Sequence, residues 1–274
     1  MKRKKRLLTF YLPLALLVAF IVLPYLWTLV TSLKTTNELY STQVTLFPKS
    51  PSVENYKMLL KETDFLGSVC RSFAVGMITS LLAMVVATMA GYAISRYRFR
   101  GRTVILRGIL LLYMFPSVLF LTPLYKVFNT LKLIGSNLAL VIAYCTFTIP
   151  FGIWLLVSYI DEIPREIDEA GMIDGANVFQ IIIRLLFPLL CPGLVATGSY
   201  IFINSWNEYL YAVMFTTSKN RTLPVMLSSL VGQYDIRWDL ISAGAVLALL
   251  PTVILFMLVQ KQLISGLASG SVKG

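Results

Sequence analysis

The sequence of 274 residues contains no histidine and only three cysteines, and this scarcity argues against several kinds of metal site. Zinc, haem and iron–sulfur centres are held mainly by cysteine and histidine side chains. Cys70, Cys145 and Cys191 lie in or beside different apolar stretches, so they form no ligand cluster and suggest no disulfide framework. We therefore expect neither a metal site nor a cofactor bound by this chain.

Charged residues are also scarce, which argues against a soluble domain. Only 14% of the residues are charged and 57% are hydrophobic, and the mean hydropathy is +0.76. In soluble globular domains about 25% of residues are charged. The composition therefore indicates an integral membrane protein before any pattern along the chain is considered.

Long stretches without any charge are the main feature of the sequence. They cover residues 7–33, 72–95, 108–125, 133–160, 185–207 and 240–260. A helix needs about 20 apolar residues to cross the hydrocarbon core of a bilayer, and it satisfies its own backbone hydrogen bonds there. The strands of a membrane barrel would instead alternate apolar and polar residues. Prolines inside these runs, such as Pro116, are expected to kink the helices.

The runs predict an all-α integral membrane protein with six transmembrane helices in a single domain, 1–274. The first run is too long for a cleaved signal peptide, so we expect it to remain as the first helix. We place the helices at about 7–33, 70–95, 105–128, 136–160, 186–215 and 240–262, with a loop at 161–188.

The net charge of +11 comes largely from two short basic segments, residues 2–6 and residues 96–107. Short loops rich in Lys and Arg stay in the cytoplasm. With six helices, this rule predicts that both termini are cytoplasmic. The segment between the first two helices is also basic, but it is long and mixed in sign, so it carries less weight. We attribute the positive charge to membrane orientation and to contact with anionic lipid rather than to nucleic acid.

Acidic residues are few, 13 in all, yet six of them gather in the loop at 161–188: Asp161, Glu162, Glu166, Asp168, Glu169 and Asp174. Carboxylates after Pro164 suit the start of a helix, and Gly175 suits its end. Asn177 and Gln180 then fit a capping box at the start of another helix. We predict two short helices, bent at Gly175, that lie against the membrane on the cytoplasmic side.

Two interpretations of this loop fit the residues. Ala170, Gly171, Gly175 and Ala176 are small, so another protein's backbone could approach closely, and the surrounding carboxylates would meet basic groups on that partner. This pattern favours a docking site for a cytoplasmic protein. The alternative is a solvated amphipathic loop with ordinary helix caps.

A family resemblance favours docking. The loop resembles the E-A-A-x3-G-x9-I-x-L-P signature of permease subunits of ABC importers, with mild departures at Gly171, Leu185 and Phe187. In that family this loop forms a coupling helix that inserts into a cleft of an ATPase subunit. The resemblance implies a coupling role for Glu169, Ala170, Gly171, Asp174, Gly175 and Pro188.

Three further stretches resemble the sugar importers, and among them the maltose-type second permease subunit, along nearly the whole chain. They are GYAISRYRFRG at 91–101, SWNEY at 205–209 and GLASGSVKG at 266–274. The last lacks the Gly-Lys-Ser/Thr order of a phosphate-binding loop. The resemblance implies a type I ABC importer transmembrane domain in the bacterial inner membrane, forming half of the pathway. Its partners would be a second permease subunit, two ATP-binding subunits that hold ATP and Mg²⁺, an extracytoplasmic solute-binding protein and a sugar. The chain itself would not be an enzyme.

Polar side chains recur along the fifth expected helix. Their spacing places five of them on one face: Tyr200, Asn204, Asn207, Glu208 and Tyr211. Polar groups in a span usually face the bundle interior or an aqueous cavity. These side chains suit a sugar, because amides and carboxylates bond hydroxyls and tyrosine rings pack on pyranose faces. Bonds between helices, or an aromatic belt at the membrane surface, explain them as well.

Three other functions were weighed. An ion-gradient-driven secondary transporter would use a charge inside the membrane, and Glu208 is the lone candidate. A membrane enzyme is disfavoured because the expected spans contain no nucleophile–base set. Half of an ABC exporter would normally carry its own ATPase domain, which this sequence lacks.

Overall fold

The computed structural model describes residues 7–232 and 235–270, with side chains described within 9–232 and 235–260. The basic cluster at 2–6 and the last four residues of the predicted tail lie outside this range. The described residues are mostly helical, and their one β-bridge joins Val231 and Ile236. The all-α prediction is confirmed. Five helices are long and apolar enough to cross a membrane, and a bent pair gives a sixth if it is counted as one span.

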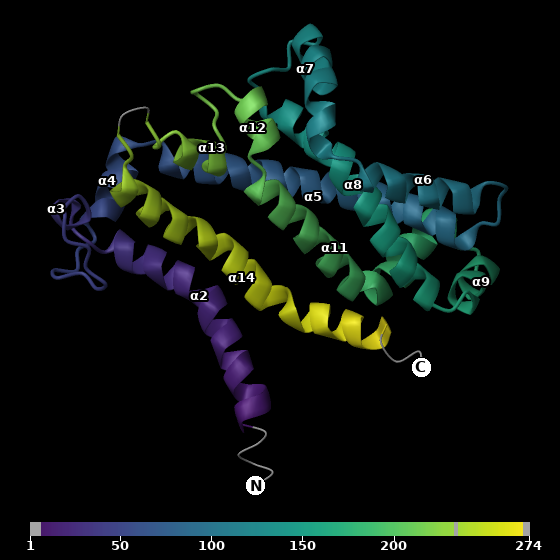
Figure 1. Ribbon diagram of the computed structural model, residues 1–274. Coiled ribbons are helices and arrows are strands. Elements are labelled where there is room, and N and C mark those ends of the chain that lie inside the picture. Colours follow the sequence, from purple (N-terminus) through teal and green to yellow (C-terminus); the bar gives the residue numbers. More distant parts are fainter. Residues whose placement is uncertain (1–6, 233–234, 271–274) are drawn as a thin grey trace. The chain divides into compact units, whose positions relative to one another are not determined.

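The chain divides into two compact units, which are described separately (Figure 1). The first unit comprises Met1–Gly67 and Met226–Pro251, and the second comprises Ser68–Val225 and Thr252–Gly274. The helix α5 begins in the first unit, and α13 and α14 also belong partly to each. The second unit contains both regions in which the sequence predicts function.

The first unit is built from α2, α3, α4 and parts of α13 and α14. Their bounds are η1 Leu7–Tyr11, α2 Leu12–Ser32, α3 Thr36–Leu39, α4 Glu54–Glu62, α13 Leu223–Ser228 and α14 Trp238–Gly270. The end of α2 is tied to α4, because the Asn55 amide donates to the carbonyl oxygens of Ser32 (2.9 Å) and Lys34 (2.8 Å). The apolar part of α2 is otherwise exposed, as suits a helix in contact with lipid.

The second unit packs around α8. Its elements are α5 Phe65–Arg96, α6 Arg102–Met114, η2 Ser117–Phe120, α7 Leu121–Thr130, α8 Asn137–Glu162, α9 Glu166–Ile173, α10 Val178–Gln180, η3 Ile181–Leu186, α11 Phe187–Asn207 and α12 Leu210–Phe215. The helix α8 lies against both α6 and α11. One core forms at its end around Leu156, Ile160 and Ile181. Another forms near its start around Tyr144, Tyr211 and Phe215.

The span expected at about 105–128 is present as a bent pair of helices. The kink expected at Pro116 is a break, and α6 meets the η2–α7 segment at a bend of 90°. Proline has no N–H to continue a helix, and its ring drives the preceding residue toward extended backbone. Phe115 accordingly has φ −71° and ψ 134°.

The continuous helix expected at 186–215 is wrong. The chain is helical before 186, in the π-helical η3, and α11 ends at Asn207. Glu208 is extended, with φ −69° and ψ 128°. Its carboxylate accepts the N–H groups of Tyr211 (2.8 Å) and Ala212 (3.0 Å) at the start of α12. This side-chain capping stabilises a new helix start and explains the break.

Candidate functional site

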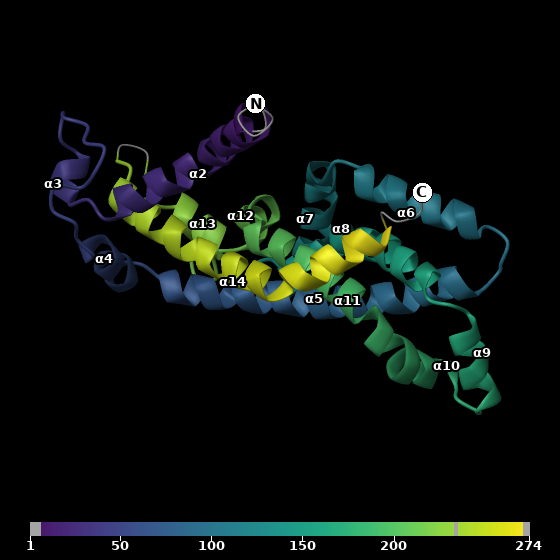
Figure 2. The same cartoon turned by 90° about the horizontal axis from the view of Figure 1, so that it is seen from below.

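The loop at 161–188 forms two short helices joined by a bend, as the sequence predicts. The helix α9 ends at Ile173, Gly175 turns the chain with φ +79°, and α10 follows. Asn177 and Gln180 form the expected capping box, in which each side chain accepts the other residue's N–H at 2.9 Å. In Figure 2, α9 and α10 project away from the long helices of their unit.

Two glycines of the loop are needed for its shape. At Gly175 the positive φ lies in a region that costs residues with a Cβ atom free energy. Gly171 is buried instead, and a Cβ atom there would lie 2.6 Å from Leu185 Cδ1 and 3.2 Å from Ile181 Cγ1. Glycine at 171 therefore lets α9 pack closely on η3. Of the remaining residues predicted to couple, Glu169, Ala170, Asp174 and Pro188 are exposed.

The surface of the loop also carries large apolar side chains that are exposed. Ile173 is 86% exposed and Phe179 is 61% exposed, and Met172 and Val178 are exposed beside them. Apolar side chains gathered on a projecting surface among carboxylates mark sites of protein contact. Ile173 is two residues after Gly171, so on a helix its side chain points away from the side on which Gly171 is buried. Its position directly before Asp174 was the available sequence signal.

The base of the loop is fastened to the end of α5. The Arg96 and Asp168 side chains form an ion pair with 2.8 Å between Nε and Oδ2. Arg96 also donates to the carbonyl oxygen of Ile163 at 3.0 Å, and Arg165 donates to that of Ser95 at 2.9 Å. The acidic cluster seen in the sequence thus divides into exposed residues on α9 and residues that hold α9 in place.

Three of the five polar residues predicted on the fifth helix share a face. Asn204 and Asn207 are exposed on α11, and Tyr200 is half-buried. The Tyr200 hydroxyl lies 2.7 Å from the Tyr113 hydroxyl of α6. Its ring centroid lies 4.1 Å from that of Phe151 on α8. Tyr113 and Phe151 were missed because they come from other helices, and only the fold brings them to Tyr200.

Glu208 and Tyr211 do not continue this face, so the prediction that all five residues share one helix face is wrong. The helix ends at Asn207, and Glu208 caps α12 with both carboxylate oxygens. Tyr211 is only 1% exposed, and its hydroxyl donates to the Ser117 carbonyl oxygen at 2.6 Å. Both side chains are occupied in holding α12.

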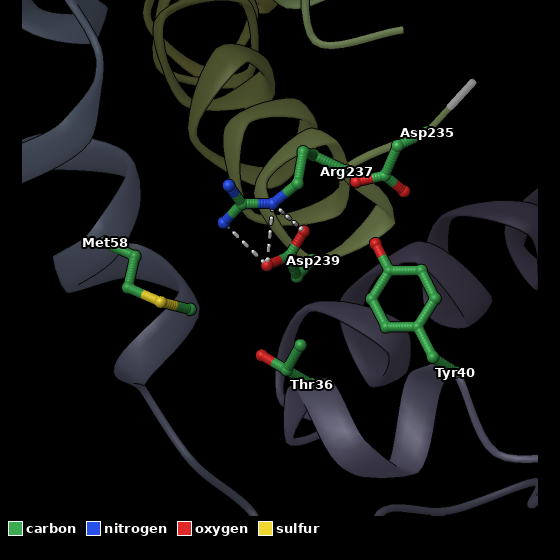
Figure 3. Close-up of a pocket in the computed structure, with 6 residues that line it drawn as sticks. All are labelled: Thr36, Tyr40, Met58, Asp235, Arg237 and Asp239. Carbon is green, nitrogen blue, oxygen red and sulfur yellow. Dashed lines mark hydrogen bonds and ion pairs between the residues drawn. The ribbon is translucent and has the colours of Figure 1, made fainter. Parts of the chain in front are cut away.

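A cavity of about 430 Å³ lies within the first unit (Figure 3), and its lining comprises Thr36, Tyr40, Met58, Asp235, Arg237 and Asp239. Arg237 binds the buried Asp239, with 3.0 Å between Nη2 and Oδ2, and the Tyr40 hydroxyl donates to the Ile236 carbonyl oxygen at 2.7 Å. Hydrogen bonding to Asp239 raises the pKa of Arg237, and burial raises the pKa of Tyr40. The bonds of Tyr40 and Arg237 tie residues 236–239 to Tyr40, the residue that follows α3. The described residues contain no cluster of potential metal ligands.

Comparison with known proteins places this geometry in context. Residues 80–268 match the family described as binding-protein-dependent transport system inner membrane component. The inner membrane ABC transporter permease protein YcjP of Escherichia coli is 36% identical over 276 residues, covering 100% of this chain and 99% of that protein. The trehalose transport system permease protein SugB of Mycobacterium tuberculosis is 32% identical over 262 residues, covering 94% and 95%.

Solved structures share the fold. A chain of a bacterial ABC transporter involved in the import of the acidic polysaccharide alginate superposes with a TM-score of 0.78. The match covers 92% of this chain and 94% of that chain at 22% sequence identity. The agreement extends over nearly the full length of both chains.

Proposed function

The chain belongs to the family of binding-protein-dependent transport system inner membrane components, and from this premise we propose that it is the permease subunit of an ATP-driven sugar importer. It is a multi-pass inner membrane protein with the all-α fold of type I importer transmembrane domains. The named substrate of a relative that is 32% identical, trehalose, supports a sugar as cargo. ATP hydrolysis takes place on separate subunits.

The observation that carries this proposal is the projecting α9–α10 loop with its exposed apolar residues. Ile173 and Phe179 lie beside the exposed carboxylates Glu169 and Asp174. A partner with an apolar cleft and a basic rim complements this surface. We assign Glu169, Ala170, Asp174 and Gly175 to contact with the ATP-binding subunit, together with Ile173 and Phe179. Gly171 supports the loop from within, and Pro188 lies exposed in the first turn of α11, where it ends the signature.

The membrane orientation follows from the same loop. The basic segment 96–107 and the loop at 161–188 are joined by the Arg96–Asp168 ion pair, so they lie on the same side of the membrane. The positive-inside rule makes this side cytoplasmic. Both termini are then cytoplasmic, and the loops after α2 and before α14 face outward toward the solute-binding protein. A second permease subunit completes the pathway, and two ATP-binding subunits hold ATP and Mg²⁺.

The mechanism is a shift between two states of the membrane helices. ATP stabilises the closed dimer of the ATP-binding subunits, and this differential affinity biases any element that the dimer grips. The gripped element here is α9, which packs on η3 through Gly171 and so acts on α11. Closure of the ATP-binding subunits therefore moves the helices from the inward-open to the outward-open state.

We further propose that the sugar passes along the face of α11 that carries Tyr200, Asn204 and Asn207. The paired hydroxyls of Tyr113 and Tyr200 and the exposed amides offer donors and acceptors for sugar hydroxyls. The rings of Phe151 and Tyr200 offer apolar faces for a pyranose. Glu208 and Tyr211 are left out of this face because their polar groups are bonded within the chain.

Reconstitution tests the proposal. The complex is purified from its native membrane through a tag on this chain and placed in proteoliposomes with a radiolabelled disaccharide panel that includes trehalose. We expect uptake that needs ATP, Mg²⁺ and the solute-binding protein. Uptake driven by an imposed ion gradient without ATP would contradict the proposal and support the secondary transporter. Uptake of another solute class, such as amino acids, would support the importer assignment but contradict a sugar as its cargo.

A further inference from the structure

We propose that the Arg96–Asp168 ion pair is the joint through which α9 moves α5, so that these two residues position the coupling loop relative to the membrane helices. The inference rests on the proposed function and deepens it, because it names the contact that transmits motion beyond the loop. Neither residue touches the ATP-binding subunit or the sugar in this account. Both act through the placement of α9.

The pair is built as an internal contact. Its Nε–Oδ2 distance is 2.8 Å, and the side chains of Arg96 and Asp168 are only 7% and 6% exposed. Tyr92, one turn earlier on α5, lies close enough to Asp168 to interact with its charge. A surface ion pair is free to open, whereas a charge buried this deeply has no water to replace its partner. The pair therefore keeps α9 and the end of α5 together.

Hydrogen bonds surround the ion pair and run in both directions between the two segments. Arg96 reaches forward to the carbonyl oxygen of Ile163, and Arg165 reaches back to that of Ser95. The Ser95 hydroxyl also bonds to Asp161. The planar guanidinium of Arg96 thus holds the residues before α9 and a carboxylate on α9 at once. This geometry resists rotation as well as separation.

The next turn of α9, on the same side of the helix as Asp168, has a different kind of contact. There Gly171 packs against the side chains of Ile181 and Leu185 on η3. Apolar packing of this kind has no directional bonds, so it permits small sliding movements. The hydrogen bonds that Arg96 and Arg165 donate to backbone carbonyl oxygens around the ion pair, by contrast, fix direction. A push on α9 is therefore passed to α5 through directional bonds, while η3 and α11 receive it through packed side chains.

A second ion pair nearby supplies a matched control. The Nη2 atom of Arg102 lies 3.7 Å from Oδ2 of Asp161, and the two side chains are 30% and 45% exposed. Exposed pairs at this distance contribute little, because water replaces either partner. Arg102→Gln removes a positive charge from the same cytoplasmic surface but leaves the buried pair intact. Asp168→Asn removes a charge from the buried pair while preserving the size of the side chain.

The experiment compares uptake with ATP hydrolysis in the reconstituted complex. We expect Asp168→Asn to keep the ATP-binding subunits bound and hydrolysing, while the amount of sugar imported per ATP falls about fivefold or more. Asp168→Glu keeps the charge and should recover most of this ratio. Arg102→Gln should stay within about twofold of the unaltered complex. A purely structural role would lower assembly and both activities together.

If the complex with Asp168→Asn does not assemble, Arg96→Lys tests whether the ion pair acts as the joint. Lysine keeps the charge but loses the fork that reaches both Asp168 and the Ile163 carbonyl, so we expect the import-to-hydrolysis ratio to fall. An unchanged ratio in Asp168→Asn, or in Arg96→Lys where only that variant assembles, overturns the joint and leaves the importer assignment standing. Absence of ATP-driven uptake in the unaltered complex overturns the proposed function and this inference with it.

Discussion

Glu208 illustrates how one residue can satisfy a sequence pattern and still serve another purpose. On a continuous helix its position places it beside Asn204 and Asn207, facing a pathway. In the structure the helix stops before it, and the carboxylate accepts two backbone N–H groups of α12. A charge inside an apolar segment is therefore stabilised by a helix start rather than by an ion or a sugar.

Replacing Glu208 tests this role. Glu208→Ala leaves two N–H groups at the start of α12 without their acceptor, and loss of such a cap costs about 1–2 kcal/mol. We expect a lower melting temperature of the detergent-solubilised complex and an unchanged KM for sugar uptake. Asn204→Ala, which removes an exposed side chain of α11, serves as the control and should leave the melting temperature unchanged. A raised KM with unchanged stability in Glu208→Ala would return Glu208 to the pathway.

Tyr200 should behave in the opposite way. Tyr200→Phe removes a hydroxyl that lies 2.7 Å from that of Tyr113 but keeps the ring that packs against Phe151. Loss of one hydrogen bond between the Tyr200 hydroxyl and the sugar is worth about 1 kcal/mol, so we expect the KM for uptake to rise about fivefold. Binding of the ATP-binding subunits should not change. Tyr25→Phe on the exposed α2 is the matched control, and an equal effect there would refute a specific sugar contact at Tyr200.

At the scale of single elements, α9 and α10 form a surface whose character depends on a few exposed side chains. Ile173→Asp places a charge in the apolar part of that surface, and central apolar residues of an interface commonly contribute 2 kcal/mol or more. We expect the ATP-binding subunits to dissociate at least about tenfold more readily, measured by co-purification over a dilution series. Val44→Asp makes the same change at an exposed position of the first unit and should have no effect.

The bend between these two helices is a separate prediction. Gly175→Asp forces a side chain into the left-handed region, and Glu169→Lys reverses a charge on the exposed face of α9. Together they should abolish most ATP-dependent uptake while membrane insertion, measured by the amount of chain in washed membranes, stays normal. Full uptake in the double variant would contradict the coupling role of this loop.

The loop could be predicted from the sequence because its structure is local. Asn177 and Gln180 are three residues apart and need only each other to start α10, and Gly175 ends the preceding turn by itself. The breaks at Pro116 and Glu208 were harder to foresee. A proline permits a kink of any size. The carboxylate of Glu208 could face the sugar pathway or accept backbone N–H groups, and only the formation of α12 decides between them. The Arg96–Asp168 contact joins residues 72 positions apart along the chain, and no spacing rule reaches that far.

At the scale of the whole molecule, the coupling loop and the proposed sugar face belong to the same compact unit. They are linked by a single stretch of chain, because α9 packs on η3 and η3 continues into α11. The cores around Ile181 and around Tyr211 make that unit resistant to internal deformation. A movement imposed at the loop should therefore reach Tyr200 as a displacement of packed helices.

The orientation of the molecule can be tested with introduced cysteines. In a variant whose three native cysteines are replaced by serine, Ala170→Cys should react with a membrane-impermeant maleimide only after the membrane is opened. Val44→Cys should react in intact spheroplasts, because it lies in the loop after α2. Labelling of both positions from the same side would refute the predicted topology.

Gly171 and Leu185 depart from the importer signature, which has alanine and isoleucine at these positions, and in the structure the two residues are in contact. The Leu185 Cδ1 methyl group lies 2.6 Å from the position that the Cβ atom of an alanine at 171 would take, which is too close for both to fit without a shift. The volume removed at one residue is thus filled by the other. We expect Gly171→Ala alone to push α9 away from η3. The double variant Gly171→Ala with Leu185→Ile should restore the packing of α9 on η3. A family signature can thus change at two contacting positions without losing its packing, provided that the two residues change together.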